Sequence, residues 1–293
     1  MALLTGGGNA LMLSDDQRLP PPGTAMDDRA APPSSLEKPG YTLEFADEFD
    51  GHDLDPDRWL TAYLPHWSAR ERTQPHYTLS DGTLILRIDP DQEPWCPECD
   101  GAVKVSSIQT GQFAGPVGSA AGQHRFREGL VVREAQPEAR LYVPRHGYFE
   151  LRAKADIAAN NLVALFMIGF EEEPEDSGEI TVMEIFGTNV TPEGTRLGHG
   201  IKRINDPRLK QEFFEDLMPF DVADWHTYAA EWSPASVDFY LDDKHLRRVR
   251  QSPAYRMQFL LNIYELPGIE APPRETPATF TIDWFRGWRR SAT

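Results

Sequence analysis

The chain has 293 residues, of which 40% are hydrophobic and 26% are charged, and its formal net charge is −17. So strong a negative charge argues against nucleic acid and anionic membranes as partners, because both would repel it, and it favours a neutral glycan over a polyanionic one. No run of eighteen apolar residues is present, so we expect no membrane span.

The first forty residues differ in composition from the rest of the chain. They contain Gly6–Gly8, Pro20–Pro22 and Pro32–Pro33 and show little apolar periodicity, so we predict a disordered leader or linker over 1–40 and one folded domain over 41–290. No basic start followed by an apolar core of signal-peptide length is present. We therefore expect a cytoplasmic protein as the sequence is written, or a secreted one if a signal was removed.

From Tyr41 onward, short strand-like runs alternate with turn residues, and long helical periodicity is scarce. One short helical segment is expected over 206–215. Many strands at this spacing predict an all-β fold, a curved antiparallel β-sandwich or barrel. The predicted strands cover residues 41–49, 83–88, 104–110, 147–155, 162–170, 178–187, 225–232, 237–241, 244–249, 257–264 and 279–286.

The most informative of these strands runs from Gly178 to Gly187 and reads GEITVMEIFG. It places Glu179 and Glu184 five positions apart in a β-branched, apolar run. Carboxylates are rarely buried without a partner, because removing the charge from water is costly. Two of them in one strand therefore indicate a wet cleft, and a carboxylate pair in a cleft is the usual equipment for cleaving a glycosidic bond. The alternative is that both glutamates lie on an exposed strand face and have no catalytic role.

Strict alternation would place Glu179 and Thr181 on one face of this strand and Glu184 on the other, with Ile180. A one-residue bulge near Val182-Met183 would return Glu184 to the face of Glu179, because an inserted residue shifts all that follows to the opposite face. Four strand intervals still span about 13 Å. A concave sheet is therefore needed to bring the carboxyl groups to the roughly 5–5.5 Å of a retaining glycosidase.

The only two cysteines, Cys96 and Cys99, lie in the sequence WCPEC. They lack the further ligands of a structural zinc site, and the following Asp100-Gly101 indicates a turn where a redox pair would open a helix. We interpret them as loop thiols or a local disulfide without catalytic meaning, and the sequence leaves their role open.

The chain resembles a family 16 glycoside hydrolase over roughly Tyr41 to Arg290. The resemblance implies a jelly-roll β-sandwich of the legume-lectin and concanavalin-A type. The motifs that carry it, in order, are Phe45–Gly51 with Leu54, Asp55 and Trp59, then Gly147–Lys154, the glutamate strand, Trp225–Trp232 with Val237–Asp242, and Ile282–Arg286.

The resemblance assigns roles to the glutamate strand. It implies that Glu179 is the nucleophile and Glu184 the general acid/base. The family pattern is Glu-x-Asp-x-(x)-Glu, and this chain has Thr181 where the orienting aspartate usually stands. Threonine can donate a hydrogen bond to Glu179, but it does not add the like charge that raises the pKa of the acid.

Candidate sugar contacts come from two places. The strand before the active site often carries tryptophans in this family, and here it reads Asn161-Leu162-Val163-Ala164-Leu165-Phe166, which predicts a weakened stacking floor. Tyr63, His66 and Trp67 could supply aromatic contacts from the loop after the first strand, with ordinary loop packing as the alternative for Trp67. His199 follows the catalytic strand where family members often place a cleft histidine, and a structural hydrogen bond is the alternative.

The resemblance also points to a metal position. Some family members bind calcium on the convex face, and the matching positions are Glu48, the carbonyl of Gly82, and Asp283. Oxygen ligands of this kind suit a hard cation. The alternative is ordinary salt bridging, so we expect no required cofactor and keep a structural calcium ion as a hypothesis.

Together these features predict a retaining, endo-acting glycosidase on a β-linked, neutral polysaccharide such as a β-1,3- or mixed-linkage glucan. A transglycosylase, or a lectin-like glycan-binding protein with weak or no turnover, is the alternative. No Gly-x-Ser-x-Gly elbow or His-Glu-x-x-His pair suggests another hydrolase. We expect a monomer with a polysaccharide or oligosaccharide substrate and with neither nucleic acid nor membrane as a partner.

The first prediction concerns Thr181. Thr181→Asp restores the family's third carboxylate, which should raise the pKa of Glu184, so the pH–rate profile should move toward alkaline pH and its maximum should rise. Rates measured from pH 4 to pH 9 check this. An unchanged profile would show that the third acid has no influence here.

Overall fold

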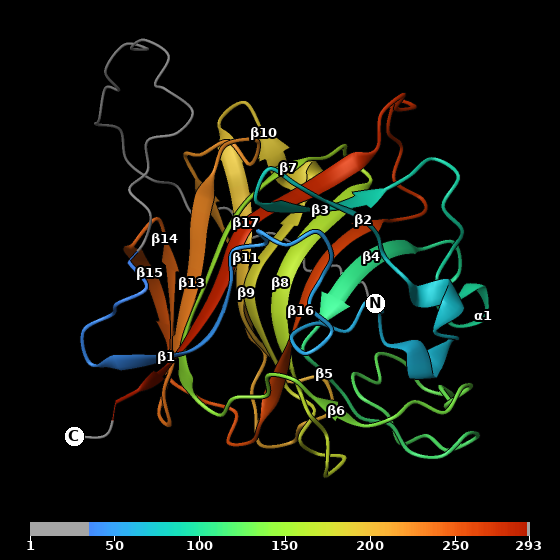
Figure 1. Ribbon diagram of the computed structural model, residues 1–293, viewed down its shortest axis with the longest axis horizontal. Coiled ribbons are helices and arrows are strands. Elements are labelled where there is room, and N and C mark those ends of the chain that lie inside the picture. The colour runs from blue at the N-terminus through green and yellow to red at the C-terminus, as the bar shows by residue number, and fades with distance from the viewer. Residues whose placement is uncertain (1–34, 292–293) are drawn as a thin grey trace.

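The computed structural model describes residues 35–291, and within them the protein is built almost entirely of antiparallel strands in two sheets that pack face to face (Figure 1). The expected all-β sandwich is confirmed. Of the predicted leader, residues 1–34 lie outside the described part of the chain.

The first sheet contains eight strands, in the order β15-β14-β13-β7-β17-β3-β2, with β1 paired to the free half of β17. The long strand β17 therefore carries β3 along its first half and β1 along its second half on the same edge. The strands of this sheet are β1 (Tyr41–Asp47), β2 (His76–Ser80), β3 (Thr83–Ile88), β7 (Gly147–Asp156), β13 (His226–Trp232), β14 (Val237–Leu241), β15 (Lys244–Val249) and β17 (Ala278–Arg290).

The second sheet contains seven strands and carries the glutamate strand near its centre. Its order is β10-β11-β9-β8-β16-β4, with β12 paired to β11. Its strands are β4 (Lys104–Gln109), β8 (Asn161–Gly169), β9 (Glu179–Phe186), β10 (Val190–Thr191), β11 (Gly194–Lys202), β12 (Glu212–Met218) and β16 (Met257–Glu265).

Short elements connect the strands. The helix α1 (Pro97–Asp100) and two 3-10 turns at Pro65–Trp67 and Glu71–Thr73 lie together at one side of the sandwich, next to β4 (Figure 1). The two-residue strands β5 (Gly111–Gln112) and β6 (Ala139–Arg140) form a small ladder of their own. No helix among residues 35–291 is long and apolar enough to cross a membrane.

Every strand predicted from alternation is present, with ends that differ by a few residues. The helical segment expected over 206–215 is wrong: turns occupy its first part and β12 begins at Glu212. The strands β2, β11 and β12 and the two-residue strands β5, β6 and β10 were not predicted. Gly194, Gly198 and Gly200 break the alternation of β11, and β12 at the sheet edge carries mostly half-exposed residues.

A large apolar core fills the space between the two sheets. At its centre lies Phe259 of β16, which is fully buried. Its ring packs on Phe149, Phe285 and Tyr142, at centroid distances of 4.8, 4.9 and 5.6 Å. Strands of both sheets therefore meet at this ring, as the inward-facing residues of a sandwich must.

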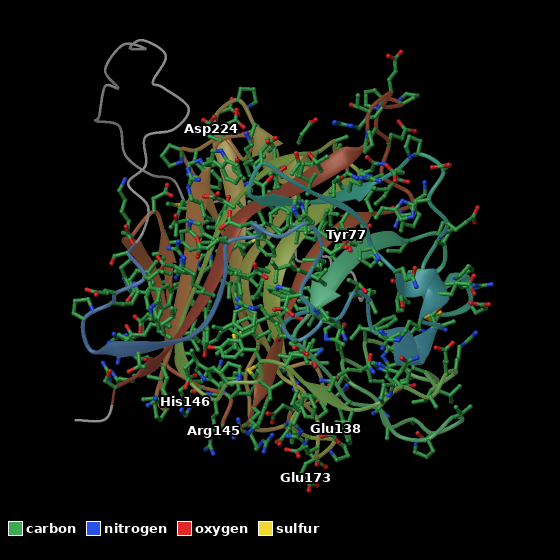
Figure 2. The ribbon with its side chains drawn as sticks, viewed as in Figure 1. Tyr77, Glu138, Arg145, His146, Glu173 and Asp224 are labelled. Carbon is green, nitrogen blue, oxygen red and sulfur yellow. A yellow bond between two sulfur atoms is a disulfide. The ribbon has the colours of Figure 1, made fainter. Side chains whose placement is uncertain are left out.

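Several charged side chains lie on the loops at the two ends of the sandwich. Figure 2 shows Glu138 and Glu173 at one end and Asp224 at the opposite end. The strand faces between the sheets are largely apolar, so each buried charged cluster on a strand needs a structural or functional explanation.

Phe259→Ala should lower the free energy of unfolding by about 3–5 kcal/mol, because it leaves a cavity between the two sheets. Urea denaturation followed by tryptophan fluorescence measures this. Leu217→Ala, at a side chain that is 47% exposed, is the control and should change stability by less than about 0.5 kcal/mol. Equal losses in the two variants would contradict the central place given to Phe259.

Candidate active site

The two glutamates of β9 lie on the same face of the second sheet. Ile180, Met183 and Ile185 point into the apolar core between the sheets, whereas Glu179 and Glu184 face away from it. Their side chains are only 4% and 9% exposed, and a single ammonium group contacts both. The pair therefore lies in a confined space, as two catalytic carboxylates require.

A bulge in β9 produces this arrangement. Against β11, Gly200 pairs with Thr181 and Gly198 with Glu184, so two steps on β11 oppose three on β9. Against β8, Phe166 pairs with Thr181 and the adjacent Leu165 with Met183. Val182 is the extra residue opposite β8, and the shift opposite β11 falls between Thr181 and Glu184. The predicted bulge near Val182 is confirmed.

Lys202 at the end of β11 joins the two carboxylates. Its Nζ lies 3.1 Å from Oε1 of Glu179 and 2.8 Å from Oε2 of Glu184. Because both contacts end on one nitrogen atom, these two oxygens are at most about 6 Å apart, which accommodates the roughly 5–5.5 Å of retaining glycosidases. Thr181 donates a hydrogen bond of 2.6 Å to the same oxygen of Glu179, as the sequence allowed.

The three charged groups shift one another's pKa. Burial opposes ionisation of Glu179, but Lys202, His124 and the hydrogen bond from Thr181 outweigh it and hold its pKa below the usual value. For Glu184, burial together with the charge of Glu179 outweighs the attraction of Lys202, so its pKa is raised. One carboxyl is thus biased toward the ionised form and its neighbour toward the protonated form.

Lys202 is a site residue that the sequence alone did not predict. Its pairing to Glu179 across β11 and β9 appears only once the register is known. Two glycines at alternate positions upstream of Lys202 allow β11 to lie close to its neighbouring strands. A Cβ atom at Gly198 would lie 2.9 Å from the carbonyl oxygen of Glu184. Gly200 has a φ of +139° and a side chain there would strike the carbonyl of Glu212.

The expected aromatic sugar contacts are wrong for His66 and Trp67. Both side chains are completely buried. The indole Nε1 of Trp67 donates a hydrogen bond of 2.9 Å to the carbonyl of Gln123, and the ring Nε2 of His66 donates one of 3.1 Å to the same oxygen. These residues fasten a second loop onto the sheet, so the packing alternative holds for Trp67.

Tyr63 is also buried, with 7% of its surface exposed. Its ring packs edge-on against Trp95 and Tyr264, at centroid distances of 4.8 and 5.6 Å. The charge of Glu179 acts on the hydroxyl groups of both tyrosines, so the pair borders the carboxylate site. Tyr63 is therefore part of the wall beside the glutamates, and it offers no open ring face for stacking.

The expectation that His199 lines the cleft is wrong. Alternation along β11 turns Lys202 toward the glutamates and His199 toward the core, where its ring lies 5.3 Å from that of Phe239. Its Nδ1 contacts the carbonyl of Leu197 at 3.3 Å, and its Nε2 lies 3.5 Å from Asp216. The structural alternative for His199 is the one that the structure supports.

The strand before β9 forms an apolar floor without tryptophan. Leu162, Ala164, Phe166 and Ile168 of β8 are buried under the loops that carry Tyr63 and Trp67. Phe166 stacks on His124, with centroids 5.8 Å apart. The apolar loops therefore occupy this part of the sheet face, and the site lies beside it over β9 and β11.

Of the three positions considered for calcium, the carboxylates of Glu48 and Asp283 are bound by arginines, and no arginine contact within the described part of the chain involves the carbonyl of Gly82. Both carboxylate oxygens of Glu48 accept hydrogen bonds from Arg286, at 2.7 and 2.6 Å, and Asp283 accepts one of 2.5 Å from Arg152. Residues 35–291 contain no group of three or more His, Cys, Asp or Glu side chains placed to hold a metal. Calcium would have to displace both arginines, so the arrangement favours the salt-bridge alternative.

Cys96 and Cys99 form a disulfide at the start of α1, which is one of the two outcomes that the sequence left open. Both are buried beside Trp95 in the apolar cluster of the loops. The bond closes a four-residue segment and therefore strengthens the loop that covers the sheet.

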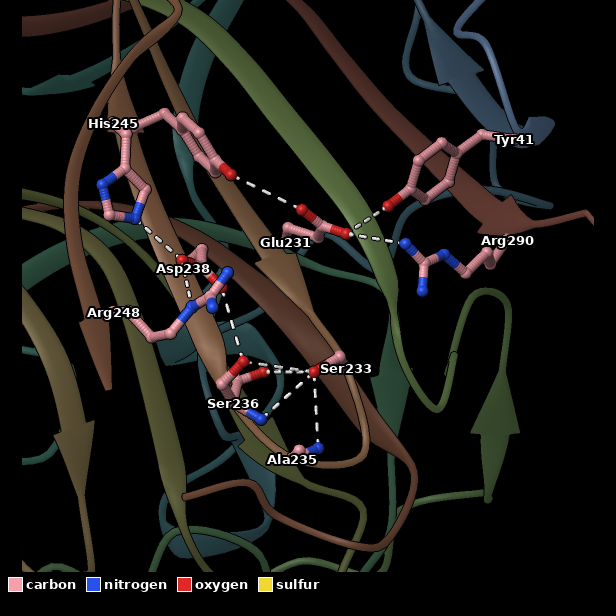
Figure 3. A network of polar contacts seen from close by, with 10 residues as sticks. Tyr41, Glu231, Ser233, Ala235, Ser236, Asp238, His245, Arg248 and Arg290 are labelled. Atoms are coloured by element: carbon pink, nitrogen blue, oxygen red, sulfur yellow. Dashed lines mark hydrogen bonds and ion pairs between the residues drawn. The ribbon is translucent and has the colours of Figure 1, made fainter. Parts of the chain in front are cut away.

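A second polar cluster lies on the outer face of the first sheet (Figure 3). Glu231 accepts a hydrogen bond of 2.5 Å from the hydroxyl of Tyr41 and lies 3.6 Å from Arg290. Asp238 contacts His245 and Arg248 at 2.7 and 2.8 Å. Each acid is bound by partners from its own sheet, so this network holds neighbouring strands together. It is a poorer candidate for a catalytic site than the glutamate pair of β9.

Comparison with known proteins agrees with the family resemblance seen in the sequence. The sequence profile of "Glycosyl hydrolases family 16" matches residues 142–286, which include β9. A β-glucanase from Rhodothermus marinus is 25% identical over 217 residues, which cover 71% of this chain and 65% of the relative.

Among solved structures, a GlcNAcα1-4Gal-releasing endo-β-galactosidase from Clostridium perfringens is 33% identical, with a TM-score of 0.79 over 90% of this chain and 66% of that one. A laminarinase from Flavobacterium sp. UMI-01 shares the fold, with a TM-score of 0.59 at 16% identity over 85% of this chain and its own full length. The chain thus spans about two thirds of the glucanase and of the endo-galactosidase.

The two-sheet fold is a jelly-roll β-sandwich, and the glutamate pair on its second sheet is of the glycosidase type. The chain belongs to family 16 of the glycosyl hydrolases.

The buried imidazole of His66 should make the fold sensitive to acid. Burial lowers its pKa from 6.5 to about 4 in the folded protein. Between these pH values the unfolded chain binds a proton that the folded chain does not bind, so stability falls as the pH drops from about 6.5 to about 4. His66→Gln should reduce this loss by about 3 kcal/mol.

Urea unfolding at pH 7.5 and pH 4.5 measures the difference. His52→Gln, at an exposed histidine, is the matched control and should leave the acid sensitivity as it is in the wild type. A His66→Gln variant that loses as much stability at pH 4.5 as the wild type would contradict a neutral, buried imidazole.

Proposed function

We propose that this chain is a retaining, endo-acting glycosidase that cleaves a β-galactosidic linkage inside a glycan. One observation carries the mechanism: Glu179 and Glu184 share a face of the sheet and a single ammonium group, which bounds the distance between them. A pair this close leaves little room for a water molecule between acid and sugar, which an inverting enzyme would need.

The reaction follows from the two charge states. Glu179, whose pKa is lowered, attacks the anomeric carbon as a carboxylate. Glu184, whose pKa is raised, gives its proton to the glycosidic oxygen, so the bond to the leaving sugar breaks as the glycosyl ester forms. Glu184 then takes a proton from water, which attacks the ester and releases Glu179.

The likeness to the Clostridium perfringens endo-β-galactosidase supports the choice of linkage. It is 33% identical and covers 90% of this chain, whereas the laminarinase is 16% identical. The β-glucanase relative, at 25% identity, keeps the β-glucan expected from the sequence as the second candidate.

A substrate panel tests the proposal. An oligosaccharide with an internal β-linked galactose should be cleaved faster than laminarin, lichenan or xyloglucan, and the first product should keep the β-anomeric configuration by proton NMR. Glu179→Gln should lower kcat by at least about 10³-fold because it removes the nucleophile. Glu193→Gln, at an exposed carboxylate between β10 and β11 that has no contact with the pair, is the matched control and should leave kcat within about twofold.

Other outcomes separate the alternatives. Faster cleavage of laminarin or lichenan would assign a β-glucan, and transfer to an added acceptor sugar would indicate a transglycosylase. Binding of these glycans by the wild type without any product would overturn the proposal in favour of a glycan-binding protein.

A further inference from the structure

We propose that Lys202 is a positioning residue of this site, which orients both glutamates and sets the pH range in which they work. The inference rests on the proposed function for its kinetic consequences. Its geometric basis, one ammonium group bound to two carboxylates, is independent of any substrate.

The contacts leave one oxygen of each carboxylate available. Oε1 of Glu179 receives both Thr181, at 2.6 Å, and Lys202, at 3.1 Å, while Lys202 binds Oε2 of Glu184 at 2.8 Å. Within the described part of the chain, no hydrogen bond ends on Oε2 of Glu179 or on Oε1 of Glu184. Attack on the sugar and protonation of the leaving oxygen can each use the open oxygen while Lys202 stays in place.

Lys202 is itself held in place. Its backbone pairs with Glu179 across β11 and β9, and its Nζ lies 4.5 Å from the centre of the Phe213 ring on β12. Its side chain is 21% exposed, and the two carboxylates raise the pKa of its ammonium despite burial. Lys202 therefore stays charged throughout the range in which the glutamates titrate.

The other titratable groups around the pair have smaller or opposite influence. His124 lies near Glu179, but burial lowers its pKa to about 4, so it is neutral above that pH. Glu215 on β12 acts on Glu184 as a like charge, and the hydroxyl groups of Tyr63 and Tyr264 are neutral because burial raises their pKa. Lys202 is thus the strongest cationic influence on both carboxylates.

The site consequently has the opposite charge balance to the family pattern. That pattern adds a third carboxylate, which favours a protonated acid, whereas this site has the uncharged Thr181 and an ammonium group. An opposite charge at hydrogen-bond distance lowers a carboxyl pKa by about one to three units. Removing Lys202 should therefore move the titration of both glutamates to higher pH.

Lys202→Met, which keeps much of the side-chain length without the charge, is the test, and Lys202→Arg retains the charge. In Lys202→Met, both limbs of the pH profile of kcat/KM should move toward alkaline pH by about one unit or more, and kcat should fall more than KM changes. Lys202→Arg should keep both limbs close to those of the wild type. Lys244→Met, at an exposed lysine of β15, is the control and should change nothing.

A second measurement does not depend on turnover. Carbon-13 NMR of the glutamate carboxyl groups, assigned with Glu179→Gln and Glu184→Gln, should show both titrations shifted upward in Lys202→Met. If this shift occurs while no glycan is cleaved, the role of Lys202 stands and the proposed function fails.

The inference is overturned if the carboxyl titrations and the pH limbs of Lys202→Met coincide with those of the wild type, whatever its Tm. A purely structural role would give that result together with a lower Tm and a uniform loss of rate. Lys202→Gln provides the same comparison should the methionine variant fail to fold.

Discussion

One extra residue in β9 governs the chemistry of this protein. Side chains alternate strictly along a strand, so Glu184 would face the apolar core if Val182 were paired like its neighbours. A carboxylate in that core, beside Met183 and Ile185, would be too costly to remain charged. The bulge places Glu184 with Glu179 and keeps the apolar residues on the other side. Fold stability and carboxylate geometry therefore depend on the same local irregularity.

The charge balance of the site follows from neighbouring strands. Two carboxylates this close repel each other, and in low dielectric one of them would take up a proton at neutral pH. Lys202 from β11 compensates this repulsion, and Thr181 satisfies the same oxygen of Glu179 without adding charge. The two glutamates differ because Lys202, His124 and the hydrogen bond from Thr181 together outweigh burial at Glu179, whereas burial and the charge of Glu179 outweigh Lys202 at Glu184.

The loops over the second sheet decide how much of its face is open. The segment around His66 and Trp67 binds the carbonyl of Gln123, whose side-chain amide donates hydrogen bonds to Gly169 and Gln258. Polar contacts thus hold a predominantly apolar cover on β8 and β16. Aromatic residues that could have stacked on sugars are used to bury this part of the sheet, and the site is confined to β9 and β11.

Local patterns in the sequence were enough for the strands with clear alternation and for the glutamate pair with its bulge. Period-two patterning and the cost of burying charge act within a few residues, so they can be read without a partner strand. The same reasoning failed at β11, where glycines interrupt the pattern, and at His66, Trp67 and His199. Whether an aromatic or imidazole side chain is buried depends on what covers it, and that is a contact between distant segments.

By itself, the sequence determined the fold class, the strand that carries both glutamates and the face on which they lie. Only the tertiary structure placed Lys202 between them, paired Glu48 and Asp283 with arginines, and buried the aromatic side chains of the loops. The physical reason is the distance along the sequence over which each effect acts. Alternation and the bulge follow from the residues of one strand, whereas the register between strands decides which charges meet.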